Sequence, residues 1–374
     1  MSANASFIAR QKKLTALLER EGLDALAINP GPSLPYLTGL HFHLSERPVV
    51  ALFTRDHAPV VVLPELEGMK VEGLPYTVTC FTYTESLPSW DQAFARAIET
   101  AGLRGKKIGV EPRCLRVLEL RFLEHAAPNA RFVSGESVVS TLRMQKDDVE
   151  LNLMQKATVI AQDALLATLP LIREGITERE VAAELVLQLL RHGSQPELPF
   201  QPIVAFGENS ANPHAVPSGR KLMRDELVLI DWGANVDGYL SDLTRTFAFG
   251  TVDPELNRIA EIVANANEAG RLATRPGVTA GSIDQAARDA ITNNGYGDFF
   301  IHRTGHGLGL ETHEEPYIRG DNTQVLKEGM TFTIEPGIYL PGVGGVRIED
   351  DMVVTANGAE SLSDLPRGLA TIGD

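Results

Sequence analysis

The sequence predicts two domains: an α/β domain over residues 1–140, followed by an α+β domain with an internal repeat over residues 141–374. Three observations predict this fold class. A chain of 374 residues is longer than one hydrophobic core usually serves. Strand-like and helix-like segments alternate in the first half, which is typical of an α/β layer architecture. The second half contains two similar pairs of helices, and an apolar strand with an acidic residue follows each pair.

Each element of the first domain has its own pattern. The N-terminal residues 1–22 read as an amphipathic helix and lack the apolar stretch of a signal peptide. Apolar runs bounded by turn residues predict six strands, at residues 23–29, 49–53, 60–64, 76–83, 106–111 and 130–135. Helical patterns fall between the later strands, at residues 90–102 and 115–128. This half contains no cluster that looks catalytic, and we place its end near residue 140, before a long helix.

The second domain is predicted to begin with helices that carry clear start signals. Thr177 with Glu180 has the pattern of a capping box, and Asp253 followed by Pro254 is a typical helix start. Each pair of helices is joined by a turn with the pattern Gly-hydrophobic-Thr. The four helices are predicted at residues 147–172, 178–193, 253–274 and 280–295.

The two helix pairs have nearly the same distance to an acidic residue at the end of a strand. From Gly175 to Asp231 the interval is 56 residues, and from Gly277 to Glu335 it is 58 residues. We therefore expect two related halves that face each other, with the acidic side chains of both halves between them. The alternative is a chance resemblance between helical hairpins, which are common.

Composition excludes several classes of function. The net charge of −15 comes from 34 basic and 49 acidic residues, so nucleic acid and anionic membranes are disfavoured as partners. Cys80 and Cys114 form no CxxC pattern, which argues against a disulfide framework and against a cysteine metal site. No run of 18 apolar residues is present, so we expect no membrane span and a cytoplasmic protein.

Five side chains in the second half form a ligand set for two divalent cations. All five lie in glycine-punctuated, strand-like stretches: Asp231, Asp242, His306, Glu335 and Glu349. Carboxylate oxygens suit hard cations such as Mn²⁺, while an imidazole keeps Co²⁺ and Zn²⁺ available. Asp231 follows the apolar run LVLI, and a lone buried aspartate is costly unless it is paired or bound to a metal. Two metals in one site indicate a hydrolase.

Four motifs carry a resemblance to a known family: DWGANVDGYLSDLTRTF, GHGLGLETHEEP, the IEPG of TFTIEPGIY, and VRIEDDMVVT. In this order they resemble the pita-bread metallopeptidases, in the branch of Xaa-Pro aminopeptidase (aminopeptidase P) and Xaa-Pro dipeptidase (prolidase). The first domain resembles the creatinase-type N-terminal domain of that branch, which methionine aminopeptidases lack. The resemblance covers most of residues 141–374 and makes these residues the catalytic domain.

The resemblance implies a role for each of the five ligands. Asp231 would bind one metal, Asp242 and Glu349 would bridge both, and His306 with Glu335 would complete the second site. Manganese is the metal that we expect, with cobalt and zinc as alternatives. Two divalent cations, four carboxylates and a bridging hydroxide leave the site near −1, which suits the free ammonium group of a peptide.

The implied reaction is hydrolysis of the Xaa-Pro bond at the amino end of a peptide. A hydroxide that bridges the metals would attack the carbonyl carbon, and Glu335 would carry a proton to the leaving nitrogen. His214 and His313 would stabilise the oxyanion. His302 and Tyr339 would bind the substrate, although a structural role is an equal alternative for both.

Arg347 precedes Glu349 by two residues and therefore shares its strand face. The family places an arginine here against a ligand aspartate, so we expect Arg347 to orient Asp231. His41 and His43 follow no metal spacing, and their role stays open.

Two other functions and several details are left open by the sequence. A creatinase-like amidinohydrolase would share the fold but lack the full metal set, and a non-catalytic peptide-binding relative would be expected to have lost ligands. The resemblance implies a proline-containing peptide as substrate and a homodimer as the assembly. It does not distinguish a dipeptide from a longer peptide, and it does not identify the metal used in the cell.

Overall fold

The computed structural model describes residues 3–373 and divides the chain into two compact units, Met1–Arg143 and Met144–Asp374. Each unit has buried hydrophobic clusters of its own. No helix among the described residues is both long enough and apolar enough to cross a membrane.

The first unit contains a six-stranded sheet with the strand order β4-β3-β2-β1-β5-β6. Parallel pairs form between β1 and β5, between β5 and β6, and between β3 and β4, whereas β2 runs antiparallel to β1 and β3. All six predicted strands are present. They are β1 (Ala25–Ile28), β2 (Val50–Thr54), β3 (Val60–Pro64), β4 (Thr79–Tyr83), β5 (Lys107–Val110) and β6 (Arg131–Ser134).

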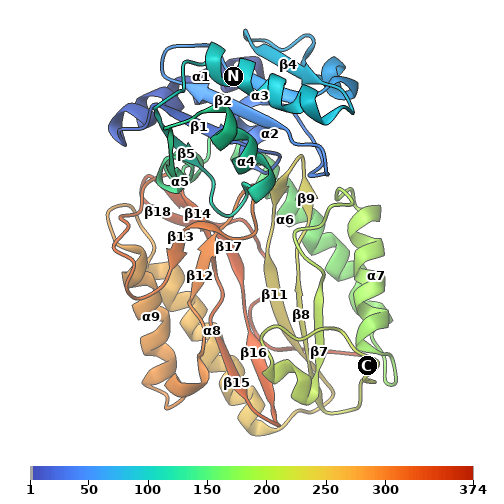
Figure 1. Cartoon of the computed structure of the whole chain (residues 1–374). Coiled ribbons are helices and arrows are strands. Elements are labelled where there is room, and N and C mark those ends of the chain that lie inside the picture. The colour runs from blue at the N-terminus through green and yellow to red at the C-terminus, as the bar shows by residue number, and fades with distance from the viewer. Residues whose placement is uncertain (1–2, 374) are drawn as a thin grey trace. The chain divides into compact units, whose positions relative to one another are not determined.

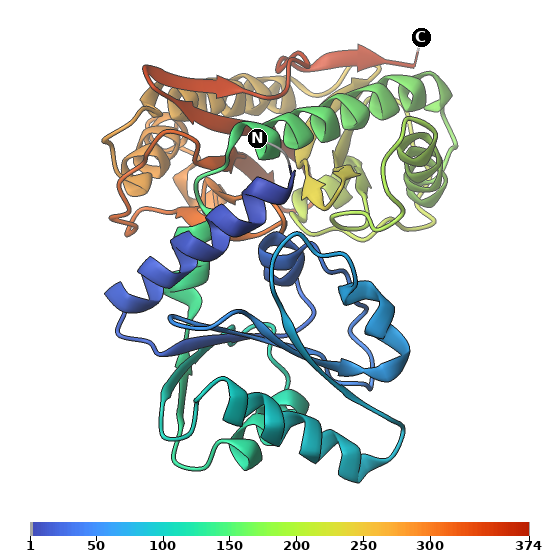
Figure 2. The ribbon, with the colours of Figure 1, turned by 90° about the horizontal axis from the view of Figure 1, so that it is seen from above.

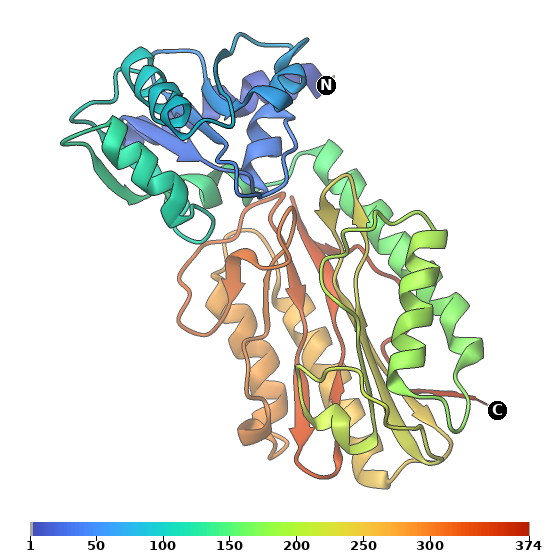
Figure 3. The same cartoon turned by 45° about the vertical axis from the view of Figure 1, so that its right-hand side comes forward.

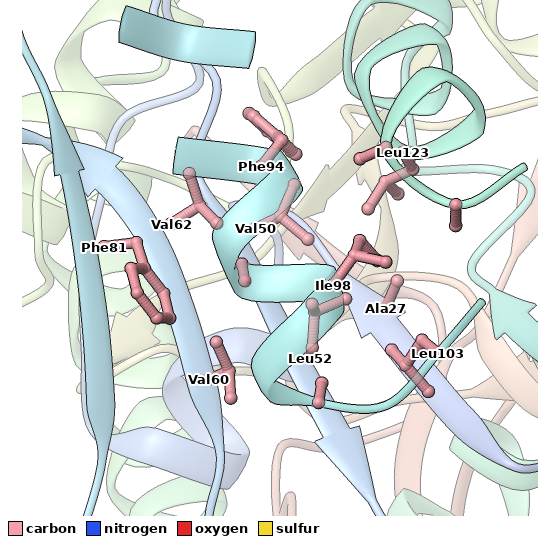
Figure 4. Packing of buried hydrophobic residues seen from close by; sticks show 14 of the residues in the cluster. Ala27, Val50, Leu52, Val60, Val62, Phe81, Phe94, Ile98, Leu103 and Leu123 are labelled. Atoms are coloured by element: carbon pink, nitrogen blue, oxygen red, sulfur yellow. The ribbon is translucent and has the colours of Figure 1, made fainter. Parts of the chain in front are cut away.

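Helices cover both faces of this sheet, which Figure 2 shows edge-on. One face packs on α3 and α4, because alternate strand residues such as Ala27, Val50 and Val62 meet Phe94 and Leu123 of these helices (Figure 4). A short helix, α2, lies in the segment that contains the stretch PGPSLP (residues 30–35), whose prolines and glycine would usually indicate a turn. The helices of the unit are α1 (Ala3–Arg20), α2 (Ser33–Thr38), α3 (Leu87–Thr100), α4 (Val117–Ala126) and α5 (Glu136–Arg143), with a 3₁₀ segment η1 (Glu65–Val71).

The second unit contains two helix pairs that flank its strands, α6–α7 in green and α8–α9 in orange (Figure 1). Thr177 begins α7 with a capping box, and Asp253 caps α8 ahead of Pro254, which confirms both predicted helix starts. The four helices are α6 (Asp148–Thr168), α7 (Glu178–Arg191), α8 (Pro254–Ala273) and α9 (Ala280–Thr292); short 3₁₀ segments are η2 (Leu169–Leu171), η3 (Gly207–Ala211) and η4 (Gly297–Phe299).

The turns within the two helix pairs make equivalent backbone bonds. Gly175 N donates to Leu222 O at 2.9 Å, and Gly277 N donates to Leu326 O at 3.0 Å. Both glycines have a positive φ, 83° and 88°, which a side chain would strain. These matching contacts place the two halves in the same local register and support an internal repeat.

Two main sheets follow the same division. The sheet of the first half has the order β19-β11-β8-β7 and is completed by β19 from the C-terminal end of the chain, whereas the second half contributes β13-β12-β14-β17-β18. In Figure 3 the yellow-green strands of the first half lie beside the orange-red strands of the second. A bridge between Thr244 and Glu349 joins the two sets. The first sheet consists of β7 (Ile203–Phe206), β8 (Glu226–Trp232), β11 (Leu243–Phe249) and β19 (Ala370–Ile372).

The second sheet and two hairpins complete the unit. Asp237 and Gly238, both with positive φ, form the two-residue turn of the hairpin β9–β10, as expected for a DG pair. The remaining strands are β9 (Asn235–Val236), β10 (Tyr239–Leu240), β12 (Gly305–Gly307), β13 (Glu314–Ile318), β14 (Thr331–Ile334), β15 (Gly337–Leu340), β16 (Gly344–Arg347), β17 (Asp350–Thr355) and β18 (Gly358–Ser361).

Candidate metal centre

The alternation of side chains along β8 directs Asp231 away from the helices. Val228, Ile230 and Trp232 pack in the apolar cluster with α6 and α7. Asp231 therefore lies on the opposite face of the strand. Asp242 lies just before β11, whose residue Leu243 pairs with Trp232 across the sheet. The two aspartates reach the site because the short hairpin β9–β10 returns the chain.

In the second half, side chains also alternate between an apolar face and a polar face along a strand. Phe332 and Ile334 of β14 pack in an apolar cluster with α9, so Thr333 and Glu335 occupy the other face. His306 is fixed beside them, since its backbone N–H donates to Thr333 Oγ1 at 3.2 Å. Glu349 lies just before β17, where Thr244 Oγ1 of the first half donates to its carboxylate at 2.6 Å.

These segments bring the five predicted ligands together in one buried place. Donor atoms of Asp242, His306 and Glu349 all lie within 4.8 Å of one another. His306 Nε2 lies 3.3 Å from Glu335 Oε1 and 3.7 Å from Asp242 Oδ2. Asp231 lines the same cavity. The site therefore takes Asp231 and Asp242 from one half and the other three residues from the second.

Burial and mutual repulsion set the protonation of this cluster. Burial, followed by the neighbouring carboxylates, raises the pKa of Asp242 and of Glu349 well above the ordinary range. Burial also raises the pKa of Glu335 to about 7, against the opposing effect of the Arg347 cation. Four carboxylates held so close are stable as anions only with positive charge among them.

Arg347 supplies part of that charge to Asp231. Its Nη2 donates to Asp231 Oδ2 at 2.6 Å, and its Nε donates to Thr244 Oγ1 at 3.1 Å. Burial still outweighs this ion pair, so the pKa of Asp231 is raised. The second oxygen, Asp231 Oδ1, is buried and has no hydrogen-bond partner among the described residues. A buried carboxylate oxygen without a donor needs another positive group, such as a metal ion.

His302 and Tyr339 form a chain of hydrogen bonds with Arg347. His302 Nδ1 lies 2.7 Å from the carbonyl of Arg303, so this nitrogen carries the proton. Burial lowers the pKa of His302 to about 4, so its Nε2 is an acceptor, and the hydroxyl of Tyr339 donates to it at 2.8 Å. Arg347 Nη1 in turn donates to the Tyr339 oxygen at 2.9 Å.

His302 and Tyr339 differ in their position relative to the cavity. His302 lines the cavity with a ring whose two nitrogens are both engaged, so it offers a neutral wall. Tyr339 is buried behind it and is absent from the cavity lining. Direct contact with substrate, which the sequence predicted for Tyr339, is therefore not supported. Its hydroxyl instead links His302 to Arg347.

His214 and His313 lie at the exposed side of the cavity. The ring of His313 lies 4.1 Å from that of His306, edge to face. Burial, with the nearby Arg303 cation, lowers the pKa of His313 to about 4. His214 follows Pro213, whose carbonyl accepts a hydrogen bond from Arg347 at 3.3 Å. Both histidines are therefore held next to the carboxylates.

The glycines beside His306 are required by close packing of the backbone. A Cβ at Gly305 would lie 1.9 Å from the carbonyl oxygen of Thr333, and one at Gly307 would lie 2.3 Å from that of Glu315. No side chain fits at either position. This is the physical reason for the GHG pattern around His306.

The cavity also contains residues that the sequence did not single out. Its volume is about 660 Å³, within the usual range of small-molecule sites. Apolar walls come from Pro199, Phe200, Ile203 and Pro213, and one further cation, Arg303, lies at the wall. Arg303 precedes His306 by only three residues in the HRTGHG stretch. Its sequence position alone did not show whether its side chain turns to the site or to solvent.

The donor set fits a divalent metal centre. His306 Nδ1 lies 3.2 Å from the carbonyl of Gly307, and this hydrogen bond leaves Nε2 with a free lone pair toward Asp242 and Glu335. Burial lowers the pKa of His306 well below its usual value, so its ring is neutral. One imidazole with four carboxylates, one of which has an orphaned buried oxygen, is a ligand set for hard or borderline divalent cations.

Comparison with known proteins agrees with this donor set. The model of the metallopeptidase family M24 matches residues 152–356, and that of the creatinase/prolidase N-terminal domain matches residues 10–145. This chain belongs to metallopeptidase family M24. Membership in M24 confirms the predicted enzyme class and fold class, and the family implies a divalent metal.

Relatives within M24 are similar over nearly their whole length. The chain is 36% identical to a putative dipeptidase of Bacillus subtilis, over 96% of this chain and 99% of the relative. It is also 36% identical to an Xaa-Pro dipeptidase of Lactobacillus helveticus, over 96% and 98%. The crystal structure of a dipeptidase from Pyrococcus horikoshii has a TM-score of 0.92 at 38% identity, over 97% and 100%.

Proposed function

We propose that this M24 protein is a dinuclear-metal exopeptidase that hydrolyses the Xaa-Pro bond at the amino end of peptides. The observation that carries the proposal is the convergence of five ligand-type side chains from both halves on one cavity that three histidines also line. The relatives named Xaa-Pro dipeptidase and dipeptidase favour the dipeptidase branch. An Xaa-Pro dipeptide is therefore the substrate that we expect first.

Metal binding is assigned to Asp231, Asp242, His306, Glu335 and Glu349. When bound, two divalent cations supply a hydroxide from water at neutral pH and polarise the scissile carbonyl. Manganese is our first choice because four of the five ligands are carboxylates, and cobalt or zinc are alternatives because the fifth is an imidazole. Arg347 orients Asp231 through the 2.6 Å ion pair.

Proton transfer is assigned to Glu335. Its carboxylate lies at the cavity beside His306, where it can act as a general base and then as a general acid. It would take a proton from the attacking water and deliver it to the leaving proline nitrogen. His214 and His313 would donate hydrogen bonds to the developing oxyanion.

Selectivity for proline is assigned to the neutral wall formed by His302. A peptide bond to proline has no N–H to donate. The imidazole of His302 offers no free acceptor to the proline nitrogen, so no hydrogen bond is lost when proline occupies the site. Both ring nitrogens of His302 are already engaged. The apolar side chains of Phe200 and Ile203 would receive the rest of the peptide.

The test compares Ala-Pro with Ala-Pro-Ala as substrates of the Mn²⁺-loaded protein. Turnover of the dipeptide alone would identify an Xaa-Pro dipeptidase, and turnover of the tripeptide would identify an aminopeptidase. No release of alanine from either would refute the proposal. Metal analysis after reconstitution separates the creatinase-like alternative, which predicts almost no bound metal.

Three further assignments belong to the same proposal. We assign catalysis to residues 141–374 and a supporting role to residues 1–140. We expect a homodimer, for which light scattering after size exclusion is the measurement. A cytoplasmic location is the expectation that fits the peptide substrate, and cell fractionation tests it.

A further inference from the structure

His214 reaches the cavity from a loop and not from a strand. The loop comprises residues 207–217 and consists of η3 followed by irregular backbone. Both Pro213 and His214 line the cavity, and the side chain of His214 is exposed. Loops of this kind are more mobile than strands unless other groups hold their backbone. The position of His214 therefore depends on what holds the two ends of the loop.

A single buried carboxylate is bonded to both ends of this loop. Glu178 is the first residue of α7 and is only 1% exposed. Its Oε1 accepts from the backbone N–H of Phe206 and from Asn209 Nδ2, both at 2.9 Å. Its Oε2 accepts from the backbone N–H and the hydroxyl of Ser218, at 2.9 and 2.6 Å. Because Phe206 precedes the loop and Ser218 follows it, one side chain closes the loop.

The start of α7 holds this carboxylate in a fixed place. The backbone N–H groups of Glu178 and Arg179 donate to the carbonyls of Arg220 and Ser218, both at 3.1 Å. These N–H groups belong to the first helical turn, which has no partners for them within the helix. The same turn favours a negative charge. Since α7 packs in one apolar cluster with β7 and β8, the loop is tied to the core through Glu178.

The middle of the loop is held from the other half of the domain. Ser210 Oγ accepts from the backbone N–H of Gly345 at 2.8 Å, and the carbonyl of Pro213 accepts from Arg347 at 3.3 Å. The backbone N–H of His214 donates to Asn212 Oδ1 at 3.1 Å. These contacts direct the middle of the loop toward the cavity. A shift of either end would still move His214 relative to the carboxylates.

The four donors around Glu178 require a carboxylate at this position. A carboxylate accepts at both oxygens, whereas a glutamine amide accepts at one atom and donates at the other. In a Glu178→Gln variant the amide nitrogen would face the donors of Phe206 and Asn209, or those of Ser218. Buried donors at one end of the loop would then lack an acceptor, which is unfavourable. Glutamine therefore releases one end of the loop while it keeps the size of the side chain.

We propose that Glu178 is a positioning residue that holds His214 at the cavity and thereby sets the rate of turnover. Among the described residues that line the cavity, Glu178 is absent, so it acts on the reaction through the loop. This inference rests on the proposed function, in which His214 donates a hydrogen bond to the developing oxyanion.

The first test is the turnover of Ala-Pro by the Mn²⁺-loaded Glu178→Gln variant. We expect kcat to fall about 10- to 100-fold, the effect of a small displacement of a catalytic group. KM should stay within about threefold of wild type, because the lost contact is made in the transition state. Glu180→Gln is the matched control on the same helix, since its carboxylate bonds to Thr177 and not to the loop. It makes the same change in charge and should keep the kcat of wild type.

A double-mutant cycle with His214→Ala separates positioning from a general structural role. If Glu178 acts through His214, adding Glu178→Gln to His214→Ala should lower kcat by less than about twofold. Losses that multiply in the double variant would overturn the inference. Ser218→Ala, which removes only the 2.6 Å bond, provides a milder second cycle if Glu178→Gln does not fold. Its loss in kcat should likewise disappear in the His214→Ala background.

Hydrogen exchange without substrate separates this inference from the proposed function. In the Mn²⁺-loaded protein, peptides that cover residues 207–217 should exchange faster in Glu178→Gln than in wild type or in Glu180→Gln. Peptides from β14 should not change. Unchanged exchange of residues 207–217 in Glu178→Gln would overturn the role of Glu178, whether or not the protein cleaves Xaa-Pro bonds. Failure of wild type to cleave Ala-Pro would refute the proposed function, and the exchange measurement would still decide whether Glu178 holds the loop.

Discussion

At the scale of single residues, the hydrogen-bond partner decides what each side chain of the site can do. Asp231 and Asp350 are both buried aspartates close to the site. Asp350 is satisfied by Arg245 and Arg367, so these cations hold its pKa low despite burial. Asp231 has one cation and one orphaned oxygen. The first is a structural ion pair, and the second retains the capacity to bind a metal.

Tyr339 allows a test of this reasoning, because its hydroxyl contacts no metal-ligand candidate directly and instead connects His302 to Arg347 by hydrogen bonds. Removing it in Tyr339→Phe leaves Arg347 Nη1 with the weaker contact to the Pro213 carbonyl at 3.3 Å and leaves His302 Nε2 without its donor. We expect kcat on Ala-Pro to fall about tenfold, which is the effect of one buried polar group left unpaired. Bound manganese should stay the same, because the ion pair of Arg347 with Asp231 is retained.

Tyr296→Phe is the control for this prediction. The hydroxyl of Tyr296 bonds to Glu255, and neither residue lines the cavity. Steady-state kinetics and metal analysis on both variants are the measurements. If Tyr339→Phe kept full activity, or if it lost its metal, the chain from His302 to Arg347 would not have the positioning role assigned to it.

At the scale of elements, the candidate site is built from the alternation of apolar and polar side chains along the strands. β8, β14 and the segment around β16 each direct apolar residues to a helix pair and polar residues to the opposite face. The polar set comprises Asp231, Thr333, Glu335, Arg347 and Glu349. A shift by one residue in any of these strands would bury the carboxylates under the helices. The helices that fix each register are therefore part of the site's construction.

The N-caps of α7 and α9, Thr177 and Thr279, allow the contribution of these helices to stability to be measured. Thr177 accepts from Glu180 N, while Glu180 accepts from Thr177 N and from Thr177 Oγ1 at 2.8 and 2.6 Å. The hydroxyl oxygen of Thr279, the equivalent residue of the second half, accepts from Ser282 N at 3.3 Å. Ser282 stands at the position of Glu180, so this cap has no carboxylate that bonds back to the threonine. Loss of a cap side chain costs about 1 kcal/mol in general. Thr177→Ala should therefore destabilise the protein more than Thr279→Ala does.

Urea unfolding followed by circular dichroism measures this difference. Thr→Ser variants at both positions keep the hydroxyl and serve as controls, with unfolding midpoints expected close to wild type. Equal losses in the two alanine variants would mean that the reciprocal bonds of Glu180 contribute nothing to the stability of α7.

The sequence predicted the elements better than their relations in space. Strands and helices followed from local periodicity. The residues that converge on the cavity followed from motifs in which glycines and acidic residues occur at set spacings. The antiparallel direction of β2 did not follow, because two short apolar runs look alike in either direction. Helix α2 was hidden by prolines that usually indicate a turn. The places of Tyr339 and Arg303 depend on neighbours distant in sequence, His302 and Tyr317 respectively, so no local pattern shows them.

At the scale of the whole molecule, the candidate metal centre lies between two halves that also share apolar packing. Leu227 of β8 belongs to one buried cluster with Val346 of β16, and Met154 of α6 belongs to another with Leu308. Asp231 and Asp242 come from the sheet under α6 and α7, whereas His306, Glu335 and Glu349 come from the half that carries α8 and α9. Direct links between the halves at the site include the bond from Thr244 to Glu349 and the ion pair of Arg347 with Asp231. Metal binding adds further links across the same place and neutralises carboxylates that otherwise repel each other. Metal occupancy should therefore stabilise residues 144–374 as a unit.

Removal of the metal tests this coupling. A ligand that binds only the folded state stabilises it by about 2.7 kcal/mol at 100 times its dissociation constant, so Mn²⁺ should raise the melting temperature clearly above that of the EDTA-treated protein. Asp242→Asn should lose most of this rise, since Asp242 supplies a central donor. Asp237→Asn, at the nearby turn, should keep it, because asparagine tolerates the positive φ of that position. Hydrogen exchange locates the effect: peptides from β8, β14 and β17 should gain protection with Mn²⁺, while those from β1 and β5 of the first unit should not change. Equal gains in all of these peptides, or an unchanged Mn²⁺ response in Asp242→Asn, would show that the metal is held somewhere other than between the two halves.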